Sequence, residues 1–327
     1  MDGAEVQARR RNPRSSSSSN VISNVTETIE RAEHNVAEAI ETLKTLTWHQ
    51  LEEWQKDNEY ITRGYRRIQN SWEGCLHSVF GYLHNETVNI HSHLWGAVMF
   101  GSFLLLNEYV VLSKYPSTTL LDTFMVSIFL CAAVLCLSFS TLYHISGSHS
   151  HSVSTQCHVF DYSGIIIMIV GSFFPCLYYA FYCDSHLQTF YMSLIVLSGA
   201  GATYVVLSPE YGKPSHIGAR TKVFIGLGLS AVIPISHALL KHGIREARED
   251  MGVDWILASA ALYIGGALLY ANRIPERFSP GTFDYFFASH QIFHVCVVLA
   301  ALAHYASVLT VIDHWHARHS GTCPAVS

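Results

Sequence analysis

Charged side chains are scarce in this sequence. Asp, Glu, Lys and Arg make up 14% of the 327 residues, whereas hydrophobic residues make up 50%; ordinary globular domains carry roughly 25% charged residues. The charges are also unevenly placed, since ten of the twenty Lys and Arg residues lie before position 68. This composition excludes an ordinary soluble enzyme. Length alone would allow about two domains, but the apolar blocks favour one membrane domain preceded by a soluble leader.

Three further signals are absent. A net charge of −5 and the lack of a basic stripe exclude a nucleic-acid partner. Residues 1–20 contain no apolar core of the kind that a secretory signal requires. The eight cysteines include no CxxC pair, so we expect neither a disulfide framework nor a thiolate zinc site. Four of them lie inside apolar runs: Cys131, Cys136, Cys176 and Cys296.

The chain before the membrane domain divides into two parts. Residues 1–20 are basic and then Ser-rich, which predicts a disordered leader. Residues 21–87 are expected to form a cytosolic, helical N-terminal region, with a helix from Asn24 to Leu46. A narrow apolar stripe of this helix allows a dimerising coiled coil, although a single helix resting on the membrane domain is preferred. The stripe consists of Val25, Ile29, Ala32, Val36, Ala39, Leu43 and Leu46.

Residues 88–312 contain seven apolar blocks, each long enough to cross a hydrocarbon core of about 30 Å as a helix of about 20 residues. Only helices and closed barrels span lipid, and continuous apolar runs favour helices. The predicted fold is therefore an all-α membrane protein with a seven-transmembrane helix bundle, followed by a tail over 313–327. The spans are placed near 90–111, 121–144, 161–182, 188–208, 221–240, 253–271 and 286–311.

Lys and Arg near the ends of the spans predict the orientation, because cytosolic loops carry an excess of them. Eight such residues lie on the side of the N-terminus and five on the other side. This favours a cytosolic N-terminus and an extracytosolic C-terminus, in a multi-pass protein of the plasma membrane or endoplasmic reticulum. The first group is Arg63, Arg66, Arg67, Lys213, Arg220, Lys222, Arg273 and Arg277, and the second is Lys114, Lys241, Arg245, Arg248 and Arg318.

Five polar residues converge on one layer of this bundle. Ser140 and His144 are four residues apart, hence on one helix face, at the cytosolic end of the second span. Asp161 begins the third span at the same level, and His290 and His294 occupy the first turns of the seventh. Ionisable residues inside a span are costly, so each is a candidate functional residue.

Other histidines do not meet the depth criterion. His304 lies about 15 Å beyond His294 along the same helix, and His237 is near the outer end of the fifth span. His91 and His93 open the first span at the right depth, but residues two apart do not share a helix face. They could contact the site or anchor the interface.

Three imidazoles with an open fourth position are typical of catalytic zinc, so His144, His290 and His294 are the predicted metal ligands and zinc the predicted cofactor. Asp161 could act as a general base, and Ser140 could orient it or the substrate. The alternative is that these histidines only form hydrogen bonds between helices.

Two further segments have competing interpretations. The linker 145–159 contains His149, His151 and His158 and is predicted to be a solvated loop rather than a second metal-binding loop. The turn from Arg273 to Phe278 is predicted to fix a tight connection between helices rather than to bind a lipid phosphate or a cytosolic partner.

Several motifs in order match one known family. They include HNETVNIHSHLWG over 84–96, LSFSTLYH over 137–144, FDYSGI over 160–165, YANRIPERFSPGTFD over 270–284 and SHQIFHV over 289–295. With these motifs the chain resembles the progestin and adipoQ receptor family, close to the adiponectin receptors and the fungal Izh proteins and related to hemolysin III. The resemblance covers about residues 48–312.

By this resemblance, His144, His290 and His294 correspond to zinc ligands, Asp161 to an acid that contacts zinc through water, and Ser140 to the serine beside the site. It implies a lipid-accessible cavity and a zinc-dependent, ceramidase-like hydrolysis of lipid amides, with roles in lipid metabolism and zinc homeostasis. Expected partners are a lipid in the membrane cavity, a protein agonist outside and a second copy in a homodimer. The alternatives are a signalling receptor with structural zinc and, less favoured because no inverted repeat is evident, a metal or proton transporter.

The sequons at Asn24 and Asn85 test the orientation. Both fall on the predicted cytosolic side, so neither should carry a glycan. Mass-spectrometric detection of a glycan at Asn85 would contradict the orientation.

Overall fold

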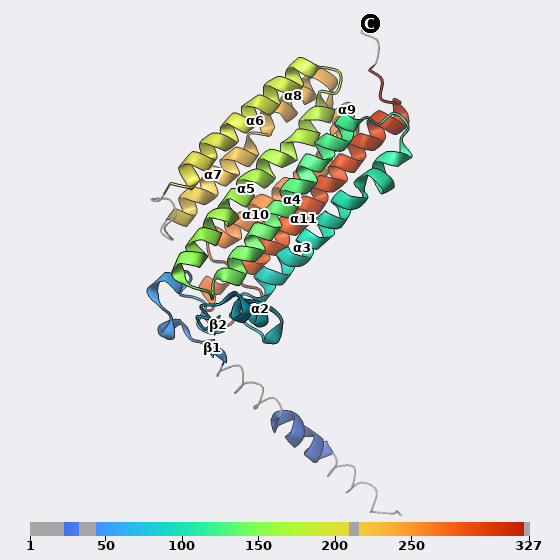
Figure 1. Cartoon of the computed structure of the whole chain (residues 1–327). Coiled ribbons are helices and arrows are strands. Elements are labelled where there is room, and N and C mark those ends of the chain that lie inside the picture. Colours follow the sequence, from blue (N-terminus) through green and yellow to red (C-terminus); the bar gives the residue numbers. More distant parts are fainter. Residues whose placement is uncertain (1–22, 33–43, 209–215, 324–327) are drawn as a thin grey trace, which may run out of the picture.

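The computed structural model describes residues 23–32, 44–208 and 216–323. Long helices run side by side in a bundle, with β1, β2 and α2 at one end and the last described residues after α11 at the other (Figure 1). We refer to these as the inner and outer ends. The predicted leader, 1–20, lies outside the described residues.

The N-terminal region is only partly helical. Residues 23–32 form a helix, as predicted, but Val25 and Ile29 are 53% and 52% exposed, so this part of the stripe is not buried on the membrane domain. Residues 33–43 lie outside the described residues. The prediction of helix as far as Leu46 is wrong, because β1 (Thr45–Leu46) pairs antiparallel with β2 (Tyr65–Arg66). A short helix, α2 (Trp72–Gly81), follows.

The bundle begins with α3 (Thr87–Leu106), α4 (Leu120–Ser146), α5 (His151–Ala180) and α6 (Ser185–Val206). It continues with α7 (Ile217–Leu229), α8 (Val232–His242), the short α9 (Ile244–Met251), α10 (Val253–Ala271) and α11 (Ser289–Ile312). The chain is a multi-pass integral membrane protein.

Six helical segments in the described part of the chain are long and apolar enough to cross a membrane. They are α4, α5, α6, α7 with α8, α10 and α11. The remaining predicted span corresponds to α3, which is 20 residues long but begins with polar side chains such as Asn89, His91 and His93. These side chains make α3 less apolar over its length than the other six segments.

Burial separates central from peripheral helices. The apolar stretch of α11 is 56% buried inside the protein, whereas that of α10 is only 17% buried. One core cluster joins α3, α4, α5 and α11 through residues such as Phe100, Phe129 and Val308, and a second joins α5 to α6, α7 and α8 through Phe181, Ile195 and others. The peripheral helices bury less of their apolar surface against protein, because lipid surrounds them.

Two predicted boundaries differ from the structure. The span predicted near 221–240 is interrupted after Leu229, where α7 ends, and Pro234 follows in the first turn of α8. Proline has no N–H to donate and crowds the carbonyl four residues earlier, which accounts for a break there. The span itself is confirmed, since Ile217–Lys241 is long and apolar enough to cross a membrane. The linker predicted over 145–159 is wrong, since α5 begins at His151 and only a short turn precedes it.

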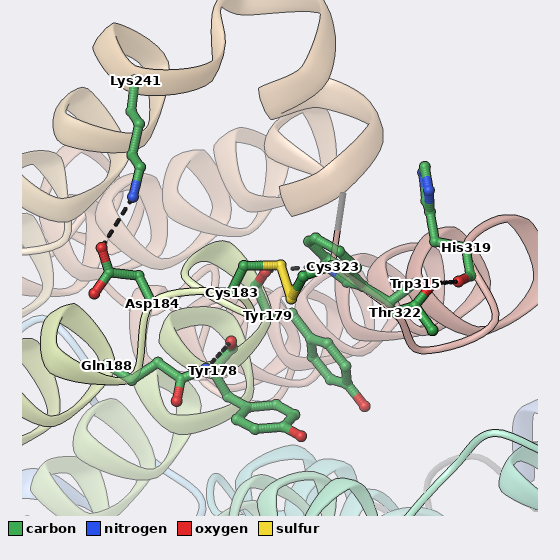
Figure 2. The surroundings of a disulfide bond; sticks show 10 residues. All are labelled: Tyr178, Tyr179, Cys183, Asp184, Gln188, Lys241, Trp315, His319, Thr322 and Cys323. Atoms are coloured by element: carbon green, nitrogen blue, oxygen red, sulfur yellow. Dashed lines mark hydrogen bonds and ion pairs between the residues drawn. A yellow bond between two sulfur atoms is a disulfide. The ribbon is translucent and has the colours of Figure 1, made fainter. Parts of the chain in front are cut away.

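The outer end contains a disulfide, which corrects the prediction on cysteines. Cys183, after α5, is bonded to Cys323 in the C-terminal segment, 140 residues away (Figure 2). The predicted tail starts as a continuation of α11 over Asp313–Arg318. Its Trp315 donates from Nε1 to the carbonyl oxygen of Tyr179 at 3.0 Å. The C-terminal segment is therefore tied to the outer end of the bundle.

Candidate functional site

The structure brings together three histidines from two helices. His144 lies near the end of α4, and His290 and His294 lie in the first two turns of α11. One ring nitrogen from each lies within 4.8 Å of the others, and His144 and His294 are buried. In the described part of the chain, this is the group of His, Cys, Asp and Glu side chains that could hold a metal ion.

The orientation of the rings suits a metal. The Nδ1 of His144 lies 2.6 Å from Oε2 of Glu86, and the Nδ1 of His294 lies 3.1 Å from the carbonyl oxygen of Asn89. Each ring is thus held through Nδ1, which leaves Nε2 for the centre of the cluster. The Nε2 of His144 is buried and has no hydrogen-bond partner among the described residues. A buried, unpaired nitrogen costs about 1–3 kcal/mol, and metal coordination would remove that cost.

Glu86 is the important residue of this site that the sequence analysis missed. It immediately precedes α3, and Asn89 donates from Nδ2 to its Oε2 at 2.7 Å. Burial opposes ionisation of Glu86, but the His144 imidazole and Asn89 outweigh it and hold the pKa of Glu86 well below its usual range. The Glu86 carboxylate therefore faces Nδ1 of His144. The sequence feature that could have identified Glu86 is its position, directly before the polar first turn of a predicted span.

Arg66 binds the backbone at the same end of α4. Its guanidinium is buried and donates to the carbonyl oxygens of His144 and Ile145, the latter at 3.2 Å, and to Oγ of Ser78 at 3.0 Å. The last carbonyls of a helix have no partner within it, and a cation there is favourable. Burial lowers the pKa of Arg66, with Glu86 acting in the opposite direction. Arg66 thus fixes the helix end that carries His144.

The two histidines of α3 have separate positions. His93 is buried and stacks on His294, with ring centroids 3.8 Å apart and planes inclined by 16°, and its Nε2 lies 3.2 Å from the His294 carbonyl oxygen. His91 instead meets the edge of Phe80, 5.4 Å between centroids. His93 therefore packs against the site, and His91 faces away from it.

Asp161 and Ser140 lie together beside the cluster. Ser140 of α4 is buried, and its side chain lies near the carboxylate of Asp161 on α5. The two helices approach closely here: a Cβ added at Gly164 would lie 3.0 Å from the Cα of Cys136. A larger residue at position 164 would separate Asp161 from Ser140.

A cavity of about 840 Å³ opens onto this site. His290 and Asp161 both line it, with Tyr143 nearby, and its mid-section is apolar, with Met168, Phe224, Phe293 and others. At the inner end it is bordered by Trp54, Asp57 and Arg220, and towards the outer end by Cys176 and His304. The cavity thus joins a polar inner end to an apolar interior.

The other histidines considered from the sequence have local partners. His304 is away from the cluster, with Nε2 2.9 Å from the Ser172 carbonyl oxygen, and the Nδ1 of His237 lies 2.8 Å from the Tyr191 hydroxyl. The three histidines of the predicted linker each pack on an aromatic ring: His149 on Trp72, His151 on Trp54 and His158 on Tyr143.

The turn over Arg273–Phe278 connects the bundle to the N-terminal region. Arg273 forms an ion pair with Asp57 at 3.0 Å, and the fully buried Glu276 accepts hydrogen bonds from Asn58 at 3.1 Å and from Ser289. These contacts favour the structural interpretation of the turn over lipid-phosphate binding.

Comparison with known proteins identifies the family. The model of the family described as "Haemolysin-III related" matches residues 81–305, more than half of the chain. The chain is 37% identical over 281 residues to "Progestin and adipoQ receptor-like protein 1" of Caenorhabditis elegans, with 86% of this chain and 63% of the relative covered. The chain belongs to the haemolysin-III related family. The resemblance inferred from the sequence motifs is confirmed.

Two other relatives have similar sequence identity to this chain but differ in length. "ADIPOR-like receptor IZH2" of Saccharomyces cerevisiae is 36% identical, with 86% of this chain and 89% of the relative covered. "Adiponectin receptor protein" of Drosophila melanogaster is 34% identical, with 84% and 63% covered. The chain therefore spans less than two thirds of the nematode and fly proteins but most of the yeast protein.

The hydrogen bond between Glu86 and His144 predicts an effect on metal affinity. Replacing a carboxylate that orients a ligating imidazole typically weakens metal binding about 10- to 100-fold, so Glu86→Ala should do so while the protein still folds. Competition with a fluorescent chelator would measure this for zinc. Glu73→Ala, at an exposed position of α2, is the matched control. Equal affinities of the two variants would show that Glu86 does not orient a ligand.

Proposed function

We propose that this protein is an intramembrane zinc hydrolase that cleaves a ceramide-like lipid amide. One observation carries the proposal: His290 of the histidine cluster and Asp161 line the same apolar cavity. A candidate metal ligand and an acid therefore face the space that would receive a lipid.

Zinc is the metal that the donor set favours. The three donors are neutral imidazoles, which zinc accepts readily, and three protein ligands with an open position are typical of catalytic zinc. Neutral ligands also avoid placing several like charges in a region of low dielectric constant. When bound, zinc would supply a Lewis acid for an amide carbonyl.

The residues of the chain would bind the substrate and move the proton. The apolar mid-section of the cavity would hold an acyl chain and exclude bulk water from its neighbourhood. A carboxylate oxygen of Asp161 would accept a proton from the attacking water as the oxygen of that water adds to the amide carbonyl carbon. It would deliver this proton to the amine nitrogen as the C–N bond breaks, so that a fatty acid and an amine leave. Ser140 lies near this carboxylate. Glu86 would keep the His144 ring turned toward the centre of the cluster.

The proposed topology has seven spans, with α3 as the first, a cytosolic N-terminus and an extracytosolic C-terminus. In support, α3 runs alongside α4 in the bundle (Figure 1), and Phe100 of α3 belongs to the main core cluster. The Cys183–Cys323 disulfide at the outer end also supports this orientation, because disulfides persist on the oxidising side of a membrane. Asn85 is buried, which agrees with an unglycosylated sequon.

Removal of one histidine tests the hydrolase. Purified protein in lipid nanodiscs should release fatty acid from ceramide, and His290→Ala should lower the rate to that without protein because it removes both a candidate ligand and a cavity wall. His91→Ala, a histidine of similar depth that faces away from the cluster, should retain the activity. Three quantities would be compared among the unaltered protein and the two variants. They are fatty-acid release by mass spectrometry, zinc content and the temperature of thermal unfolding. Equal turnover by His290→Ala and the unaltered protein would exclude this mechanism.

A second candidate is a signalling receptor whose metal is structural, since the names of the yeast and fly relatives describe receptors. Signalling would then pass through the N-terminal segment. Deleting residues 1–43 preserves β1 and hence the β1–β2 pair next to Arg66. Loss of a cellular response with unchanged ceramide hydrolysis would support this candidate. An unchanged response would count against it.

A further inference from the structure

Helix α2 packs on the bundle through one face. Cys75, Ser78 and Val79 are almost completely buried, and Cys75 and Val79 form a small apolar cluster with Ile90 of α3 and Ile145 of α4. The helix starts at a capping residue, Ser71, whose side chain accepts a hydrogen bond from the Gly74 N–H at 3.1 Å. This face fixes α2 beneath the inner ends of α3 and α4 (Figure 1).

The adjacent face of α2 is apolar and exposed. Trp72, Leu76 and Phe80, four residues apart, are 42%, 55% and 75% exposed, and we call them the α2 apolar face. At 3.6 residues per turn, the exposed Glu73 and His77 lie on a third face, beyond the apolar one. Around its axis, α2 therefore presents protein-facing, apolar and polar sides in succession, which is the pattern of a helix lying in a membrane interface.

The α2 apolar face is continuous with the lipid-facing surface of the bundle. The ring of Phe80 meets His91 of α3 edge-on, at 5.4 Å between centroids and 85° between planes. One turn along α3, on the same side as His91, Trp95 is 60% exposed, and Val98, Leu105 and Leu106 farther along are also exposed. Since α3 runs beside the membrane-capable α4, these side chains face lipid.

We propose that α2 is an interfacial helix whose apolar face lies in the inner leaflet, at the boundary between headgroups and acyl chains of the bilayer that contains the bundle. Amphipathic helices in this position insert about 5–10 Å, and Trp is enriched at this level. Glu73 and His77 would then face water. The contact of Phe80 with α3 favours lipid over a soluble protein as the occupant, because it aligns this face with an existing lipid surface.

This placement links the leaflet to the candidate metal site. Ser78, on the buried face of α2, accepts a hydrogen bond from Arg66, and the same guanidinium holds the carbonyl oxygen of His144. Lipid on one side of α2 and Arg66 on the other would therefore hold the helix against the end of α4. The inference requires only that the chain spans a membrane and does not depend on hydrolysis.

Photo-crosslinking tests the proposal at single positions. Phe80→p-benzoylphenylalanine and Leu76→p-benzoylphenylalanine place the reactive ketone on the apolar face, and His77→p-benzoylphenylalanine is the control on the polar face. Each full-length protein would be reconstituted in phosphatidylcholine vesicles, irradiated and digested, and lipid adducts would be quantified by mass spectrometry. Lipid adducts several-fold more abundant at positions 80 and 76 than at 77 are expected.

Comparable lipid adducts at all three positions, or none at 76 and 80, would overturn the proposal. Irradiation in cells provides a second criterion, since a predominant adduct of position 80 with a soluble protein would identify a protein interface instead. Thermal unfolding would confirm that each variant is folded. Because Leu76 and Phe80 are tested separately, failure of one variant to fold leaves the other as the test.

Discussion

The inner end of α4 depends on one constraint, namely that buried polar groups must be paired. Three polar groups are buried here and cannot form hydrogen bonds with water: the last carbonyls of α4, the ring of His144 and the guanidinium of Arg66. Arg66 satisfies the carbonyls, and Glu86 holds the ring. Leaving one of these groups unpaired costs about 1–3 kcal/mol or more for a charge, so the positions of β2, α2 and the start of α3 follow from this pairing.

The N-terminal region is part of the same structure for that reason. Besides Arg66, the N–H of Thr62 donates to Asp284 at 2.7 Å, and Asn58 donates to Glu276. Asp284 and Glu276 belong to the connection between α10 and α11, directly before His290. The segment before the bundle thus holds both chain segments that carry the candidate ligands, one at α4 and the other at α11.

The outer end is organised by a separate set of buried polar contacts. Asp122, fully buried at the start of α4, accepts from the Tyr179 hydroxyl at 2.9 Å and pairs with Nε2 of His316 at 3.1 Å. The disulfide joins Cys183 to Cys323 next to Trp315 (Figure 2). These contacts tie α4, α5 and the extension of α11, so both ends of the central helices are fixed. The cavity lies beside these helices, against the less buried α7, α8 and α10.

The sequence by itself determined the family, the apolar helices and the residues of the histidine cluster. Apolar blocks of about 20 residues predict helices because lipid offers the backbone no hydrogen bonds, and the four-residue spacing of His290 and His294 places both on one face. Tertiary structure alone decided the roles of Glu86 and Arg66, the disulfide partner of Cys183 and the start of α5 at His151. Each depends on contacts between distant segments, such as Glu86 and His144, whose positions differ by 58, and neither periodicity nor local spacing contains that information.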